Sequence, residues 1–96
     1  IPHYFLRDDK KTIFIAAIHD DGQFCMITEE ASKNVSEIHH RQPVILNEKD
    51  IDRYLNIEHY GSIFLKDCKK PNLTFYEISK DVNKPTNNSV SLIQQI

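Results

Sequence analysis

The sequence predicts one small α+β domain, and three observations lead to that prediction. Short apolar segments rich in β-branched and aromatic residues recur along the 96 residues, many of them bounded by charged or Asp-Gly turns. Between them lie stretches with helical spacing or helix-capping residues. Strands and short helices that do not alternate strictly are typical of α+β folds. The length allows one domain at most.

The first part of the chain predicts three strands in an antiparallel meander. Residues 3–7 form the first strand, and the charged residues 8–11 form a turn. Residues 12–19 are almost continuously apolar, so we expect a strand that is covered on both faces. The Asp-Gly turn at residues 20–22 favours a hairpin that returns through a strand at residues 23–28.

A short helix is predicted next, over residues 29–38. Its first turn is acidic, and Thr28 is a possible N-cap. Pro43 breaks the helical pattern, and residues 43–46 enter another strand.

Asn47 is expected to cap a second helix over residues 48–56. Ile51, Tyr54 and Leu55 lie at i, i+3 and i+4, which is the spacing of one apolar stripe.

The remainder of the chain gives weaker signals before a final strand region. Residues 57–70 fit either a helix broken near Gly61 or an irregular loop. Residues 72–79 read as a strand, 81–89 as a turn-rich loop, and 91–96 as a short final strand. Because few strands are available to cover such apolar ones, we expect exposed strand edges and apolar patches.

The composition is that of an ordinary soluble globular chain, with 40% hydrophobic and 27% charged residues. The net charge of −2 predicts no general attraction to nucleic acid, so DNA binding would need a local patch. One such patch is a cluster of lysines in the C-terminal half, although a solvated surface explains it equally well. No apolar run approaches the length of a membrane span, so we expect no membrane partner.

Two cysteines, Cys25 and Cys68, suggest a reducing compartment more than a disulfide. Cys25 alternates within an apolar strand and is expected to pack in a core. Neither cysteine has a CxxC partner, and their spacing to His39, His40 or His59 does not suggest zinc. We therefore expect no metal and no small-molecule cofactor.

The most informative segment is residues 35–46, which reads VSEIHHRQPVIL. His39 and Arg41 are two residues apart, so in an extended segment both point to one side. A proton-transfer group beside a fixed cation suits chemistry next to a phosphate. From these residues alone, a structural histidine and an arginine that is solvated or paired with Glu37 remain possible. His40 is expected on the surface, on the opposite side.

Residues 38–46 resemble an Ile-His-x-Arg-x-Pro-Val-Ile-Leu pattern of the SOS-response-associated peptidase (SRAP) family. The flanks are similar too. Upstream, Thr28, Glu30 and Ala31 stand at the family's offsets, and the first two strands look like the family's. The matching downstream positions are Val82, Asn83, Pro85, Asn87, Leu92 and Ile93. The resemblance is therefore nearly end to end.

The resemblance implies a SRAP-like mixed, barrel-like fold and an enzyme of the DNA-damage response. Family members bind single-stranded DNA and capture abasic sites through an N-terminal cysteine, whose thiol and α-amine form a thiazolidine with the opened sugar. The same site removes the initiator Met by autoproteolysis. By resemblance, His39 is the catalytic residue that transfers protons. Arg41 contacts a DNA phosphate, and Thr28 lies on the site wall near the sugar.

Several family features are missing here. The chain begins Ile1-Pro2 with no cysteine there, has no tryptophan, and lacks the family's upstream catalytic glutamate. We expect residues 1–96 to be the C-terminal portion of one SRAP domain, inactive alone and partnered by the missing N-terminal half. The alternative is a non-catalytic remnant or binding module that retains the fold. Glu29 and Gln42 depart from the family pattern, and the charge of Glu29 counts against DNA binding. The expected location is the cytoplasm, with nucleoid association if the protein is bacterial.

Overall fold

The computed structural model describes residues 1–56 and 61–96. Strand β1 (His3–Arg7) pairs antiparallel with strand β8 (Leu73–Glu77), near the other end of the sequence. Cross-strand aromatic pairs join them, with ring centroids 5.5 Å apart for Tyr4–Tyr76 and 5.2 Å for Phe5–Phe75. Such pairs stabilise an antiparallel register. The predicted three-strand meander is therefore wrong, because β1 finds its aromatic partner in β8 and not in the following strand.

Three longer segments supply the other strands, and each is divided in two by a change of partner. The divided strands are β2 (Phe14–Ile15) and β3 (Ala17–Asp20), β4 (Gln23–Met26) and β5 (Thr28–Glu30), and β6 (Arg41–Pro43) and β7 (Ile45–Leu46). The antiparallel pairs are β2–β7, β3–β4 and β5–β6. Every segment thus pairs with the other two.

The three segments meet at Ala16, Ile27 and Val44. The Ala16 amide donates to the Val44 carbonyl at 2.8 Å, Val44 donates to Ile27 at 2.8 Å, and Ile27 donates to Ala16 at 2.9 Å. This ring of hydrogen bonds satisfies the buried backbone where the strands separate. Ala16, at 1% exposure, is small enough for the crowded centre. In the described residues the strands form no closed barrel, and the mixed α+β class is confirmed.

Helical turns cover one side of this junction. A 3-10 turn (Glu48–Asp50) leads into α1 (Ile51–Asn56), and α2 (Gly61–Asp67) follows the undescribed residues. The predicted second helix is thus confirmed in position. The alternatives for residues 57–70 are decided only in part, because residues 57–60 lie outside the described residues.

Strand β7 contributes side chains to two hydrophobic clusters, because neighbouring residues of a strand face opposite sides. Leu46 packs with Ala16, Val44 and the α2 residues Phe64 and Leu65. On the other side, Ile45 packs with Val35 and Leu73, with Phe5, Ile13 and Ala31 at the margin. The two clusters place the helices on one face of β7 and the β1–β8 pair on the other.

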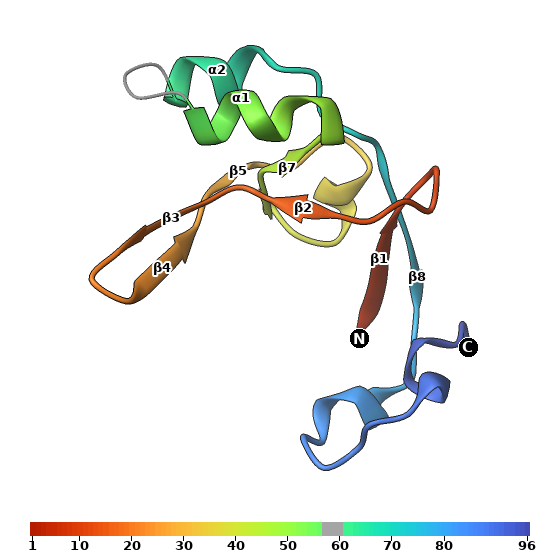
Figure 1. Ribbon diagram of the computed structural model, residues 1–96. Coiled ribbons are helices and arrows are strands. Elements are labelled where there is room, and N and C mark those ends of the chain that lie inside the picture. Colours follow the sequence, from red (N-terminus) through yellow and green to blue (C-terminus); the bar gives the residue numbers. More distant parts are fainter. Residues whose placement is uncertain (57–60) are drawn as a thin grey trace.

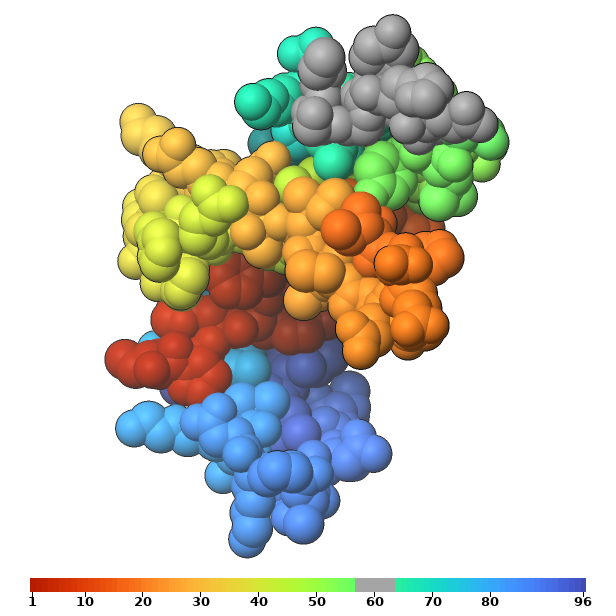
Figure 2. Space-filling model, turned by 90° about the vertical axis from the view of Figure 1, so that its left-hand side faces the viewer, coloured from red at the N-terminus to blue at the C-terminus, as the bar shows by residue number. Residues whose placement is uncertain are grey.

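The molecule is elongated, with extents of 44 × 32 × 23 Å. Figure 1 shows α1 and α2 at one end, the C-terminal turns at the other, and the β3–β4 hairpin projecting from the body. The space-filling view in Figure 2 shows the same separation of the green helices from the blue C-terminal residues. The hairpin turn is as predicted: Asp21 and Gly22 have φ values of 49° and 74°, which a primed turn requires.

The predicted helix over residues 29–38 is wrong. Residues 28–30 form strand β5, and only Val35–Glu37 makes a 3-10 turn. Pairing with β6 outweighs the local helical pattern, since propensity is a weak preference. Thr28 is therefore not an N-cap.

Three burial predictions also fail. The apolar segment 12–19 is not covered on both faces: Ile18 is 61% exposed and Phe14 is 38% exposed. Cys25 is exposed on the projecting hairpin and does not pack in a core. In α1, Ile51 and Tyr54 reach the first cluster, whereas Leu55 is 72% exposed. Apolar residues on β3 and β4 extend beyond the helices that could cover them, so the expected apolar patches are present.

The C-terminal region contains 3-10 turns in place of the predicted final strand. They span Lys80–Asn83 and Val90–Ile93. The Leu92 and Gln94 amides donate to carbonyls three residues earlier, so this segment closes on itself. The bridge Ile78–Gln95 joins it to the strand region, as do hydrogen bonds from the Tyr76 hydroxyl to the Ile93 carbonyl and from the Ile96 amide to the Glu77 carbonyl.

Candidate active site

His39 and Arg41 line the same cavity, of about 450 Å³, as their spacing predicts. The cavity lies over the second hydrophobic cluster, between the β1–β8 pair and the 3-10 turn that precedes His39. Its apolar walls include Phe5, Ile13, Ile15, Val35, Ile45 and Leu73. The two polar side chains, both exposed, therefore stand at the edge of an apolar recess.

The His39 ring is held by the backbone of Arg41. Nδ1 lies 3.1 Å from both the amide nitrogen and the carbonyl oxygen of Arg41. An unprotonated Nδ1 accepts the amide proton, and a protonated Nδ1 donates to the carbonyl. In either tautomer, Nδ1 is engaged in a hydrogen bond with the backbone of Arg41. Within the part of the chain that the structure describes, Nε2 makes no hydrogen bond, so Nε2 is the nitrogen available for chemistry.

The strand register explains why the Arg41 amide can reach His39. Val44 donates to Ile27 and Ala31 donates to His40 across the β5–β6 ladder. Because hydrogen-bonded and non-hydrogen-bonded pairs alternate, Arg41 opposite Glu30 is a non-hydrogen-bonded pair. Its amide therefore points away from β5. The same alternation puts Pro43, which has no amide proton, at a position where none is needed.

Arg41 also contacts the third predicted site residue. Its Nη2 donates to Oγ1 of Thr28 at 3.1 Å. Thr28 and Arg41 are diagonal neighbours on one face of the β5–β6 pair, within reach of a long side chain. The structure thus brings His39, Arg41 and Thr28 together. Among the described residues, Arg41 forms no ion pair, and the possible pairing with Glu37 is absent.

His40 is exposed as expected but does not lie on the opposite side from His39. The two rings are stacked, with centroids 4.6 Å apart and planes inclined by 21°. The bend before β6 brings the side chains of consecutive residues together, which an ideal strand would not do.

Two departures from the family pattern have structural partners that are distant in sequence. Glu29 forms an ion pair with Lys70, with Oε2 and Nζ 3.2 Å apart, so its charge is offset. Gln42 is buried, and its Oε1 accepts from the Ser32 amide at 2.9 Å and from the Ser32 hydroxyl at 3.2 Å. Gln42 therefore fixes the loop before His39. Neither Lys70 nor Ser32 carries a sequence signal for these roles.

Metal-ligating residues do not converge in the described part of the chain. No group of three histidine, cysteine or acidic residues there could hold a metal ion, and His59 lies outside the described residues. Cys25 and Cys68 are both free thiols. Burial raises the pKa of the Cys68 thiol, which lowers its thiolate fraction at neutral pH. In the described ranges, none of the helices has the length and apolar character needed to cross a membrane.

Comparison with known proteins shows the family. Residues 1–85 match the family described as SOS response associated peptidase (SRAP). YoqW of Bacillus subtilis, an abasic site processing protein, is 32% identical over 73 residues, covering 72% of this chain and 33% of YoqW. HMCES of Pongo abelii, with the same description, is 32% identical over 72 residues, covering 69% of this chain and 20% of HMCES.

A yeast relative extends the match along the chain. The abasic site processing protein YMR114C of Saccharomyces cerevisiae is 24% identical over 110 residues, covering 99% of this chain and 30% of its own length. The chain thus spans a third or less of these relatives. Since the family match covers 85 of the 96 residues, the chain belongs to the SRAP family.

Proposed function

We propose that this chain forms the histidine-bearing part of a site that binds single-stranded DNA and processes abasic sites. The observation that carries the proposal is the convergence of His39, Arg41 and Thr28 at one cavity. The names of the relatives, all abasic site processing proteins, support the substrate class. The ion pair between Glu29 and Lys70 supports it too, because it offsets the one negative charge that counted against a DNA path.

Each residue has a role that its surroundings suit. His39, oriented through Nδ1, would transfer protons at the abasic sugar through Nε2. Arg41 would bind a backbone phosphate, because its guanidinium donates several hydrogen bonds in a fixed plane. Thr28 would orient Arg41 and contact the sugar. The apolar cavity beside His39 would limit water access to the opened sugar.

The covalent step needs residues outside this chain. We propose that an upstream part of the same domain supplies an N-terminal cysteine and a catalytic glutamate. The cysteine thiol and its α-amine add to the sugar aldehyde, giving a thiazolidine and one water. The same site would release the initiator Met by autoproteolysis. Such a protein would be cytoplasmic, and it would associate with the nucleoid in a bacterium.

The test uses the full-length protein and a labelled single-stranded oligonucleotide with one abasic site. A band that survives a denaturing gel is expected with the abasic strand and not with an undamaged strand. The 96-residue chain alone should give no such band, because neither Cys25 nor Cys68 has a free α-amine beside its thiol. If the full-length protein gave the same covalent band and the same binding with the damaged and undamaged strands, the proposal would be contradicted. Selective binding without a covalent band would identify a binding module.

A further inference from the structure

A second concave surface, which we call the lysine groove, lies across strand β2 from the His39 cavity. Its volume is about 910 Å³. The basic residues that line it are Arg7, Lys10, Lys11, Lys49 and Lys69. These are five of the twelve Lys and Arg residues of a chain whose net charge is −2. The groove therefore concentrates positive charge that the composition as a whole does not predict.

The charge that faces solvent in the groove comes from the lysines. Arg7 is buried and bound by Asp9 through two hydrogen bonds, of 2.9 and 2.7 Å. The hydrogen bond from Arg7 holds the pKa of the Asp9 carboxyl below its usual value, so this pair is neutral overall. Glu48 is the acidic residue among those that line the groove. In the described residues, none of the four lining lysines forms an ion pair.

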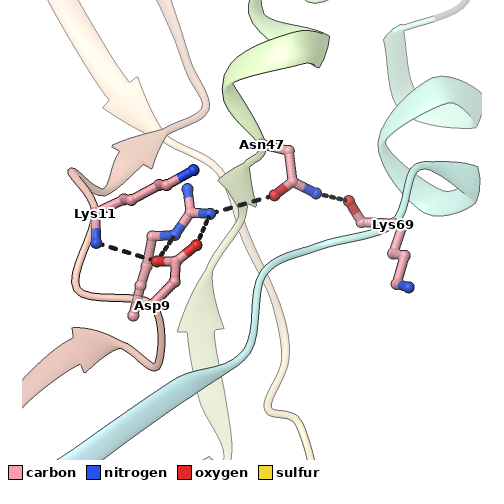
Figure 3. A network of polar contacts seen from close by, with 5 residues as sticks. Asp9, Lys11, Asn47 and Lys69 are labelled. Carbon is pink, nitrogen blue, oxygen red and sulfur yellow. Dashed lines mark hydrogen bonds and ion pairs between the residues drawn. The ribbon is translucent and has the colours of Figure 1, made fainter.

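Asn47 holds the elements around the groove together (Figure 3). Its Oδ1 accepts from Arg7 at 3.5 Å, and its Nδ2 donates to the Lys69 carbonyl at 2.7 Å. It thus links the end of β1, the end of β7 and the segment after α2. Asp9 in turn accepts from the Lys11 amide at 3.0 Å, which fixes the turn that carries Lys10 and Lys11. Asn47 occupies the predicted N-cap position, but its side chain makes no cap hydrogen bond and contacts Arg7 and Lys69 instead.

Phe14 adds an aromatic surface to the lysine groove. Ile13 and Ile15, on either side of Phe14 in the sequence, line the His39 cavity, whereas Phe14 lines the groove. This follows from the alternation of side chains along a strand. Phe14 is 38% exposed, so part of its ring can stack with a planar group. Basic side chains around an exposed aromatic ring are the combination with which proteins hold single strands without reading their sequence.

We propose that the lysine groove binds the phosphate backbone of single-stranded nucleic acid, with a base stacked on Phe14. The lysines come from three separate parts of the chain. This arrangement suits a ligand with successive phosphates better than it suits one small anion. The proposal rests on the proposed function in one respect: the strand in the groove continues the strand whose abasic site lies at His39. Binding in the groove itself needs no abasic site.

The test measures fluorescence anisotropy of the full-length protein with two single strands of about 20 thymidines, one undamaged and one with a central abasic analogue. The groove variant is Lys10→Gln/Lys11→Gln. The matched control is Lys80→Gln/Lys84→Gln, which removes two lysines from the C-terminal turn at the far end of the molecule. A third variant, Phe14→Leu, keeps the apolar bulk and removes the aromatic face.

The groove variant should weaken binding of both strands about tenfold or more. Its salt slope should flatten by about 1.4, or roughly 0.7 for each phosphate that the two lysines neutralise in the wild type. Phe14→Leu should weaken both strands about fivefold or more. The control should bind as wild type.

Three outcomes would overturn the proposal: unchanged binding by the groove variant, no wild-type binding of the undamaged strand, or equal weakening by the control. The proposed function at His39 predicts that the wild type prefers the abasic strand. If the wild type bound both strands equally while the groove effects were intact, the proposed function at His39 would be overturned instead.

Discussion

The backbone of Arg41 orients the ring of His39: its amide nitrogen and carbonyl oxygen both lie 3.1 Å from Nδ1. The side chain of Arg41 points elsewhere, to Thr28. A substitution at Arg41 therefore keeps the backbone contacts that position His39. The proton-transfer role and the phosphate role can be separated by mutation, and the first two predictions use this separation.

Replacing His39 should reduce chemistry more than DNA affinity. In the full-length protein, His39→Ala removes Nε2, so the rate of cross-link reversal or autoproteolysis should fall about a hundredfold or more. Affinity for single-stranded DNA should change little, because a neutral imidazole attracts phosphate weakly. The rate is measured by timed denaturing gels. His40→Ala is the matched control, since it removes the stacked neighbouring ring and should retain most of the rate. Equal losses in both variants would mean that the pair acts structurally.

Replacing Arg41 should have the opposite effect. Arg41→Ala removes a charge from the proposed DNA path, so binding should weaken by about 1–3 kcal/mol. The salt slope should flatten by roughly 0.7, the value of one phosphate contact on a single strand. Arg41→Lys keeps the charge without the planar fork, so it should restore the slope more fully than the affinity. Anisotropy across a salt series measures both quantities. If affinity and slope were unchanged while His39→Ala abolished binding, the two assigned roles would be wrong.

The projecting β3–β4 hairpin should make the 96-residue chain self-associate. Phe24, 75% exposed, and Met26 lie on one face of the hairpin. Their cross-strand partners are His19 and Ala17, respectively. Exposed apolar strands promote association between chains. Light scattering after size exclusion should show species larger than a monomer, and Phe24→Ser/Met26→Ser should reduce them. Val90→Ser, at an exposed apolar residue far from the hairpin, should not. A stable monomer at high concentration would contradict the proposal that this chain is part of a larger domain.

The local elements of the fold could be predicted where side-chain chemistry decides them. The Asp-Gly turn, the strand at residues 3–7 and the helix near residues 48–56 depend on neighbouring residues, and all three are confirmed. The pairing of β1 with β8 depends on contacts between distant segments, and so does the meeting of three strand segments at Ala16. Such pairing leaves no periodic signal within either strand. The helix predicted over residues 29–38 is wrong because its local pattern competes with a ladder that only the fold supplies.

In the candidate site, too, some features could be predicted from neighbouring residues and others depend on contacts between distant segments. The spacing of His39 and Arg41 predicted that both line one cavity, and they do. The bend at His40 shows that the two residues do not lie in one extended segment, which was the basis of that prediction. The contact between Arg41 and Thr28 depends on the β5–β6 register, and that between Glu29 and Lys70 joins residues far apart in sequence. The lysine groove is assembled from three segments around Asn47, so its lysines are scattered along the sequence and only the fold brings them together.

The hydroxyl of Tyr54 should make stability fall at alkaline pH. It donates to the Ala17 carbonyl at 2.7 Å, beside the crossing point of the strands. Burial raises the pKa of Tyr54 above its ordinary value of 10.0. The folded state therefore favours the protonated phenol, so this contribution is complete below the unfolded pKa and is lost as pH rises through the folded pKa.

Tyr54→Phe separates this effect from the titration of lysines, which occurs in the same range. At about pH 8 the variant should be less stable by about 0.5–1.5 kcal/mol, the usual net value of one hydrogen bond. Above about pH 10 the difference should shrink, because only the wild type has a phenol whose ionisation is disfavoured in the folded state. Urea denaturation followed by circular dichroism at several pH values measures both stabilities. A difference between the two proteins that stays constant up to about pH 11 would show that folding does not raise the pKa of Tyr54.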